Sequence, residues 1–109
     1  GADAAVHPEV QRIVREMLSA EKPLGAICIA PATLARAAGD RSPEVTVGND
    51  VGTASAIETM GGRHRNCTVE NIHVDEINRI VTTPAYMLGP GIADVAKGIE
   101  KLVDQILKM

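Results

Sequence analysis

The sequence predicts an α/β fold of the doubly wound type, in which helices cover both faces of a mostly parallel sheet. Segments with helical spacing alternate with short apolar or β-branched runs, in the order helix, strand, helix, strand, helix, strand pair, helix. One of these runs, LGAICIA at residues 24–30, has no polar residue. Such a run is typical of a strand that helices bury on both faces. With 109 residues, the chain has the length of one small domain.

The first helix is expected to begin at Pro8, because proline suits the first helical turn. Its apolar residues recur at helical spacing, with charged residues on the opposite side. These apolar residues are Val10, Ile13, Val14, Met17 and Leu18. Pro23 and Pro31 then flank the apolar run 24–30, and its length and these prolines favour a strand over a buried helix.

A second, short helix is expected over residues 31–38, with Gly39 placed to end it in a left-handed conformation. The β-branched run 44–47 is expected to be the next strand. Turn residues follow, and then an amphipathic helix that includes Ala54, Ile57 and Met60 and stops at the glycine pair 61–62.

Residues 68–83 contain two β-rich pieces around the polar DEIN, which predicts a hairpin or a strand pair at a sheet edge. The last helix has a single apolar stripe. The stripe comprises Ile92, Val95, Ala96, Ile99, Leu102, Val103, Ile106 and Leu107. Because two strands of the parallel type are few for a sheet that encloses residues 24–30, the chain is expected to be the later part of a larger fold.

Composition excludes several classes of function. The core must be aliphatic, because Trp and Phe are absent and Tyr86 is the only aromatic residue, which argues against a base-stacking module. The net charge of -3 and the lack of a basic run argue against a nucleic-acid partner. Charges interrupt every apolar run before the roughly 20 residues that a membrane span needs. We therefore expect a soluble, cytoplasmic protein with reduced cysteines.

Cys28 lies at the expected corner between the apolar strand and the second helix. A strand that turns abruptly into a helix raises the corner side chain above the sheet edge, where the N–H groups of the helix stabilise a thiolate. In that geometry the backbone N–H of Ile29 is placed to bind an oxyanion. The alternative is structural, because an unpaired cysteine often fills space in a core. The residues alone leave both interpretations open.

Several separated motifs resemble one known family. They are GAICIAPATLA (25–35), VTVGND (45–50) with GTA (52–54), and VDE followed by IVTTPAYM (74–87). In type and order they are similar to the ElbB branch of the ThiJ/PfpI superfamily, which is related to class I glutamine amidotransferases. The resemblance implies a flavodoxin-like three-layer sandwich with a mostly parallel sheet. Residues 1–109 would form the C-terminal part of one such domain, without its first βα units.

The resemblance implies that Cys28 is the family nucleophile. A glutamate beside the thiol and a second oxyanion donor would come from the missing N-terminal half, and the protein would form a homodimer. Many relatives place a histidine directly after the cysteine, where this chain has Ile29, and others place one where this chain has residues 48–50. Hydrolysis of peptides or amides by a Cys-His pair is therefore not expected.

The ElbB branch is associated with isoprenoid biosynthesis and, in some members, with glyoxalase activity. The implied activity is that of a glyoxalase III-like lyase, in which the Cys28 thiolate adds to the aldehyde of a 2-oxoaldehyde such as methylglyoxal. A carboxylate then moves a proton between adjacent carbons, and water releases a hydroxy acid. This reaction needs no metal and no cofactor. A non-catalytic or redox-sensing regulator of the same fold is the alternative function.

Three further residues are candidates for substrate binding. Asn49 and Asp50 follow a strand, at the edge where open α/β sheets bind ligands, although Asp50 could equally cap the next helix. Tyr86 follows another strand, and the resemblance places its segment near the pocket or a subunit contact, with core packing as the alternative. His64 and Cys67 have H-x-x-C spacing, but two ligands do not make a metal site.

Overall fold

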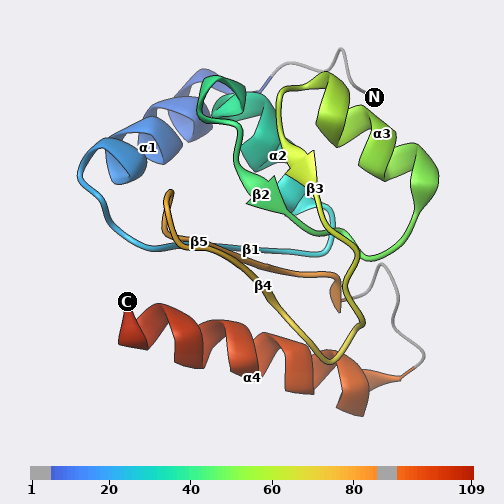
Figure 1. Cartoon of the computed structure of the whole chain (residues 1–109). Coiled ribbons are helices and arrows are strands. Elements are labelled where there is room, and N and C mark those ends of the chain that lie inside the picture. Colours follow the sequence, from blue (N-terminus) through green and yellow to red (C-terminus); the bar gives the residue numbers. More distant parts are fainter. Residues whose placement is uncertain (1–5, 86–90) are drawn as a thin grey trace.

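The computed structural model describes residues 6–85 and 91–109 of the chain. The elements of this part are α1 (Pro8–Ser19), β1 (Leu24–Ile27), α2 (Ala30–Ala37), the 3₁₀ turn η1 (Gly39–Arg41), β2 (Glu44–Val45), α3 (Val51–Thr59), β3 (Arg63–His64), β4 (His73–Asp75), β5 (Ile80–Thr83) and α4 (Ile92–Lys108). They form three layers, in which α1, α2 and α3 lie on one side of the strands and α4 lies on the other (Figure 1). The expected α/β architecture is confirmed.

The strands form one sheet with the order β1-β5-β4 and a separate pair, β2-β3. β1 runs parallel to β5, with Leu24 opposite Ile80 and Ile27 opposite Thr83, and β2 runs parallel to β3. β4 pairs antiparallel with β5, which confirms the strand pair expected around DEIN. Because β1 and β5 are parallel, their carboxyl ends lie at the same edge of the sheet. The chain directly after β2 lies close to β5 as well, because the N–H of Thr46 donates to Thr82 Oγ1 at 3.0 Å.

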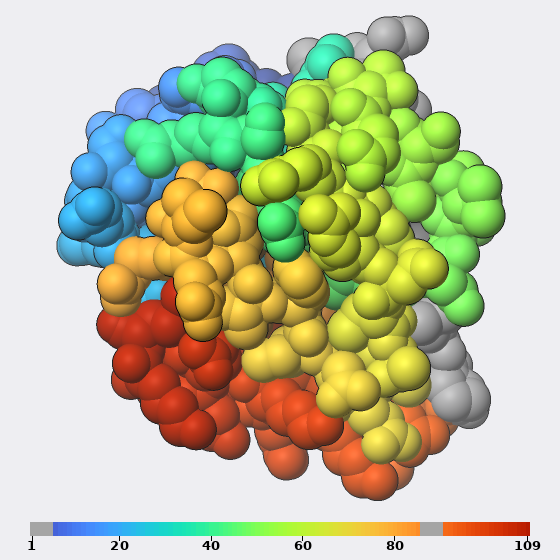
Figure 2. Space-filling view, in the orientation of Figure 1, coloured from blue at the N-terminus to red at the C-terminus, as the bar shows by residue number. Residues whose placement is uncertain are grey.

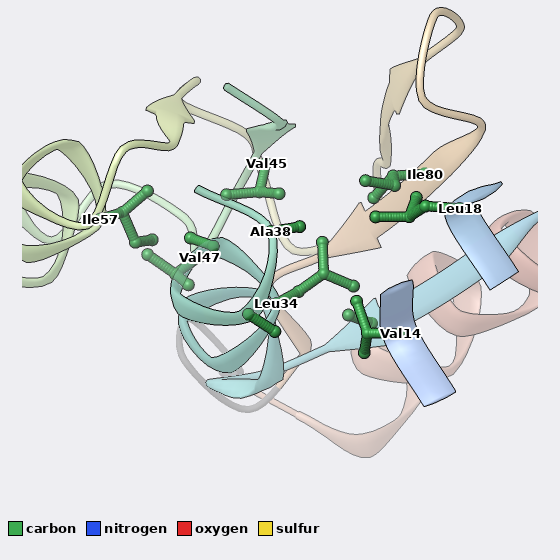
Figure 3. Packing of buried hydrophobic residues seen from close by; sticks show 11 residues of the cluster. Val14, Leu18, Leu34, Ala38, Val45, Val47, Ile57 and Ile80 are labelled. Carbon is green, nitrogen blue, oxygen red and sulfur yellow. The ribbon is translucent and has the colours of Figure 1, made fainter. Parts of the chain in front are cut away.

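The core lies between the strands and the layer of α1, α2 and α3, and it is aliphatic as expected (Figure 3). α1 contributes two of the five residues that the apolar stripe predicted there, Val14 and Leu18. Side chains from the other elements converge on the same volume. They include Leu34 and Ala38 at α2, Val45 and Val47 at β2, Ile57 in α3 and Ile80 in β5.

A buried carboxylate ties β2 to β4. Asp75 accepts hydrogen bonds from the backbone N–H of Glu44 (2.9 Å) and from the backbone and side-chain N–H groups of Asn78 (3.0 and 2.9 Å). Burial alone would raise the pKa of Asp75, but these hydrogen bonds outweigh it and lower that pKa below its usual value. On the same strands, His73 Nε2 lies 2.9 Å from Glu44 Oε1.

The prediction that residues 24–30 form one strand buried on both faces is wrong. β1 ends at Ile27, because Cys28 adopts a left-handed conformation with φ 62°, and the last residues of the run open α2. Among the described residues β1 pairs only with β5, and Gly25 and Ile27 are exposed. An apolar run indicates that a strand requires burial by other residues, but it does not identify those residues.

The prediction that Gly39 ends the second helix in a left-handed conformation is also wrong. The positive φ lies at Ser42 (46°), after η1. Gly39 is needed for close packing instead, because a Cβ built on it would lie 2.1 Å from the backbone oxygen of Met60. Gly61, with φ 104°, supplies the left-handed turn after α3.

The predicted apolar stripe of α4 is only half buried. The helix spans the residues of the stripe, but the residues that it buries are Val95, Gly98 and Leu102. Ile92 and Leu107 are 78% and 79% exposed, and Val103 is 47% exposed. One side of the stripe faces the sheet, and the other side has no cover among the described residues.

Candidate functional site

Cys28 occupies the corner at which β1 turns into α2. Its backbone N–H donates to the carbonyl oxygen of Thr83 at 3.1 Å, which continues the pairing of β1 with β5 as far as the corner. Ile29 is the N-cap residue of α2, no side chain caps that helix, and Pro31 stands in its first turn. The thiol of Cys28 is half-buried. The sequence therefore predicted the location of this corner correctly.

The backbone at the corner is strained. Cys28 has φ 62°, and such a conformation costs a residue with a side chain about 1–3 kcal/mol. The neighbouring strand ends in a similar way, because Ala85, two residues after β5, has φ 47° and is fully buried. Two adjacent parallel strands thus both end in strained backbone, at the edge where α/β proteins bind ligands.

The segment after β2 reaches the same edge. Thr46 Oγ1 accepts the N–H of Gly48 at 3.0 Å, and Gly48 turns the chain with φ 104°. Asp50 then caps α3, because its Oδ2 accepts the N–H of Thr53 at 2.8 Å and the Oγ1 hydroxyl of Thr53 at 2.6 Å. These hydrogen bonds lower the pKa of Asp50 below its usual value. The cap is thus formed; an additional binding role for Asp50 stays a prediction.

A groove of about 780 Å³ lies where α1, α2 and α3 meet. Ile29 and Asp50, which come from different loops of the sequence, both line it. The rest of its wall is mostly apolar, with His7, Thr33 and Arg36 among the polar residues. Cys28 directly precedes the lining residue Ile29 in the sequence, and Asn49 is exposed beside Asp50. Neither Cys28 nor Asn49 lines the groove. Tyr86 lies outside the described residues.

The side of α2 that faces this groove was not predicted from the sequence. Ile29, Thr33 and Arg36 are spaced at i, i+4 and i+7, so they share one helix face, and all three line the groove. Thr33 interrupts an otherwise apolar and alanine-rich segment. That spacing was the available signal, and a search for polar residues on the helix after the cysteine would have found it.

His64 and Cys67, the H-x-x-C pair, each interact with a different backbone group. His64 Nε2 accepts the backbone N–H of Val47 at 3.2 Å, and burial lowers the pKa of this imidazole although Glu58 acts in the opposite direction. Cys67 Sγ lies 3.4 Å from the carbonyl oxygen of Thr68. Burial raises the pKa of the Cys67 thiol, partly offset by Lys101. In residues 6–85 and 91–109, no three His, Cys, Asp or Glu side chains are grouped to hold a metal ion.

Known proteins similar to this chain include two sequence relatives and a structural neighbour. The chain is 36% identical over 118 aligned positions to the mitochondrial ES1 protein homolog of Rattus norvegicus, covering 100% of the chain and 44% of that protein. It is 37% identical to the mitochondrial glutamine amidotransferase-like class 1 domain-containing protein 3 of Homo sapiens, covering 43% of it. The crystal structure of an isoprenoid biosynthesis protein with an amidotransferase-like domain from Ehrlichia chaffeensis superposes with a TM-score of 0.86 at 32% identity.

These relatives and the structural neighbour support the ElbB-like branch of the class I glutamine amidotransferase-like, or ThiJ/PfpI, superfamily as the family that this chain resembles. The structural match covers 97% of the chain and 48% of the Ehrlichia chaffeensis protein, so the flavodoxin-like fold is also confirmed. No protein-family model matches the chain. It spans less than half the length of the curated relatives that it matches. None of the helices in the described part is both long enough and apolar enough to cross a bilayer.

Proposed function

We propose that the chain carries the nucleophile of a cofactor-independent, glyoxalase-like lyase that converts 2-oxoaldehydes such as methylglyoxal to hydroxy acids. The observation that carries the proposal is the corner at Cys28: a half-buried thiol on strained backbone, between a parallel strand and the first turn of α2. Nucleophilic cysteines need access and nearby positive potential, and the start of a helix supplies the latter.

The reaction is an internal redox exchange and needs no external oxidant. The Cys28 sulfur bonds to the aldehyde carbon, and the carbonyl oxygen takes up a proton, giving a hemithioacetal. A carboxylate removes the proton from that carbon and returns one to the adjacent carbon, so that the first carbon is oxidised to a thioester and the second is reduced to an alcohol. Water then cleaves the thioester, which releases the hydroxy acid and restores the thiol.

The groups around the corner have separate roles in this proposal. The backbone N–H of Ile29 binds the oxygen that becomes negative when sulfur attacks. Asn49, Asp50 and Tyr86 bind the substrate, and the groove lined by Ile29 and Asp50 receives its non-reacting part. The proton-transferring carboxylate comes from residues outside this chain. Any contribution to isoprenoid biosynthesis is proposed by analogy with the name of the Ehrlichia chaffeensis protein.

The test is methylglyoxal consumption by the protein that contains these 109 residues. Cys28→Ser should lower the rate by at least about 100-fold, because a hydroxyl at this position is a far weaker nucleophile. Cys67→Ser is the matched control and should keep the parental rate, since burial raises the pKa of that thiol. Equal rates in the parent and in Cys28→Ser would remove the enzymatic proposal.

A redox-sensing regulator is the second candidate, and the difference between the two thiols supports it. Cys67 is hydrogen-bonded to Thr68 and its pKa is raised, which slows oxidation, whereas Cys28 stands at a strained corner. Intact-mass and peptide analysis after mild peroxide should then locate oxidation at Cys28 before Cys67. Simultaneous oxidation of both, or oxidation of Cys67 first, would contradict it.

Location and assembly stay predictions. The names of the rat and human relatives describe mitochondrial proteins, so they do not support the cytoplasmic location expected from the sequence. Fractionation of the source cells would test that location. The homodimer implied by the family resemblance is tested by sedimentation velocity.

A further inference from the structure

The groove between α1, α2 and α3 has two distinct ends. Ile29 and Asp50, the residues just before α2 and α3, both line it, and this end is called the near end. Arg36 in the last turn of α2 and Met60 just after α3 line the other, or far, end. Since Arg36 follows Ile29 by seven residues of a helix, the near and far ends are about 10 Å apart.

Packing between α2 and α3 fixes the shape of this groove. A Cβ built on Gly39, just after α2, would lie 2.1 Å from the backbone oxygen of Met60. One built on Gly62 would lie 3.0 Å from Ala35 Cβ in α2. Figure 2 shows the segments that follow the two helices, η1 with β2 (green) and β3 (yellow), packed directly against each other. The lining side chains of α2 and α3 are therefore held in place without a ligand.

The wall between the two ends is mainly apolar. Val10 of α1 and Ile29 line the groove, and they are 43% and 52% exposed. Ala32 of α2 and Ala56 of α3 also line it, and their small side chains leave the space open. Each CH₂ group that an occupant buries against such a wall raises its affinity about fourfold. The wall thus favours an aliphatic chain.

The volume of the groove exceeds what the smallest substrates need. About 780 Å³ is the size of sites that bind drug-sized molecules. Methylglyoxal has only a methyl group beyond its two reacting carbons, so it would fill a small part of the near end and leave Val10 and Ala56 uncovered. The groove fits a 2-oxoaldehyde with a longer substituent.

The charges that line the groove give this substituent a direction. Arg36 supplies a guanidinium at the far end, and its five N–H donors allow it to bind a carboxylate or phosphate in addition to the contacts that it already makes. Among the described lining residues the one carboxylate is Asp50, at the near end, where it is hydrogen-bonded to Thr53. The far end therefore favours an anionic group.

From the length, the wall and the charge of this groove we infer that the substrate is a 2-oxoaldehyde whose second carbon carries an unbranched aliphatic chain that ends in an anionic group. The aldehyde lies at Cys28 and at the N–H of Ile29. The chain runs along α2, and its anionic end binds Arg36. The position of the aldehyde rests on the proposed function, whereas the binding of the chain and its anionic end is measured without any reaction.

The test measures how products of this reaction, which do not turn over, bind to the protein that contains these 109 residues. 2-Hydroxyoctanedioate has the chain and the anionic end, 2-hydroxyoctanoate has the chain alone, and lactate has neither. In NMR titrations the dissociation constant of 2-hydroxyoctanoate should be at least about tenfold lower than that of lactate, because its chain covers the apolar wall. That of 2-hydroxyoctanedioate should be lower by at least about a further fivefold, because its second carboxylate binds Arg36.

Three variants separate the anionic end from the chain. Arg36→Gln should remove the difference between the two eight-carbon products, and Arg36→Lys, which keeps the charge without the planar fork, should retain part of it. Arg41→Gln is the matched control, because this exposed arginine of η1 does not line the groove, and it should retain the full difference. Ala56→Leu fills the groove, so it should weaken both eight-carbon products by at least about tenfold and leave the binding of lactate unchanged.

Several results would overturn the inference. They are equal binding of lactate and 2-hydroxyoctanoate, equal binding of the two eight-carbon products, and the same effect of Arg36→Gln and Arg41→Gln. A dimer that Ala56→Leu dissociates would also overturn it, because a second copy would then occupy the groove. Failure of the proposed lyase is a separate result: it would be an unchanged rate of methylglyoxal consumption in Cys28→Ser, which these dissociation constants do not measure.

Discussion

Two regions of this chain differ in how completely they are packed. The first, called the inner side, lies around β2, α3 and β5, and the second, called the outer side, comprises β1 and the exposed surfaces of the helices beside it. On the inner side, around β2, α3 and β5, the side chains of Val45, Ile57 and Ile80 are fully buried. On the outer side, β1 has one partner strand, and the flanking helices expose large apolar residues such as Leu107. Both regions contain apolar runs in the sequence. The difference shows that the apolar pattern of a segment indicates how much of it must be buried, whereas the contacts show how much of it this chain buries.

The largest expected effect comes from the inner side. Ile80→Ala should lower the free energy of unfolding by about 2–5 kcal/mol, because it leaves a cavity in a fully buried position. Ile77→Ala, an isoleucine exposed in the turn nearby, should change it by less than about 0.5 kcal/mol. Chemical denaturation of both variants measures the contrast. Similar losses in the two would mean that this core is not packed as described.

An intermediate effect is expected at Asp75, which holds the inner strands together. Asp75→Asn should cost about 1–3 kcal/mol, because one buried N–H of Glu44 or Asn78 would face an amide donor in place of an acceptor. Since the folded pKa of Asp75 is lowered, its stabilisation is present above the unfolded pKa of about 3.9 and is lost as the pH falls through the folded value.

Denaturation of the parent and of Asp75→Asn from neutral to acidic pH tests this prediction. The parent should lose more stability than the variant in that window, so the two curves should converge. If the difference between them stayed constant with pH, Asp75 would not be the titrating group.

The smallest effect is expected at an exposed ion pair between α1 and η1. Arg15 pairs with Asp40 at 2.8 Å, and this hydrogen-bonded partner lowers the pKa of Asp40 to about 2. Its stabilisation is therefore present above about pH 4 and lost as the pH falls toward 2. Asp40→Asn should shift the Tm less than the two changes above, and about 1 M salt should remove the shift, since the pair is exposed. A large, salt-independent shift would contradict this.

The sequence predicted local features well. The start of α1, the end of α3, the helix that carries the stripe 92–107, the pairing of β4 with β5 and the corner at Cys28 follow from proline, glycine and apolar spacing within one segment. What it missed depends on contacts between distant segments. Gly39 is required by the approach of Met60, twenty-one positions away, and the position of Ile27 beside Thr83 arises from the pairing of β1 with β5.

The candidate site divides in the same way. Ile29 and Asp50 were each found from their own loops, but the groove that they share arises from the packing of α1, α2 and α3. No local pattern specifies that packing. The polar residues of α2 that line the groove were missed for this reason, although their spacing placed them on one helix face.

The most direct test of the uneven packing is residue-resolved hydrogen exchange of the 109-residue chain alone. The account predicts alternation along β1: slow exchange at the N–H groups of Leu24 and Cys28, which donate toward β5, and fast exchange at those of Gly25 and Ile27. Uniformly slow exchange along β1 in the isolated chain would contradict it, because the outer edge would then already be paired.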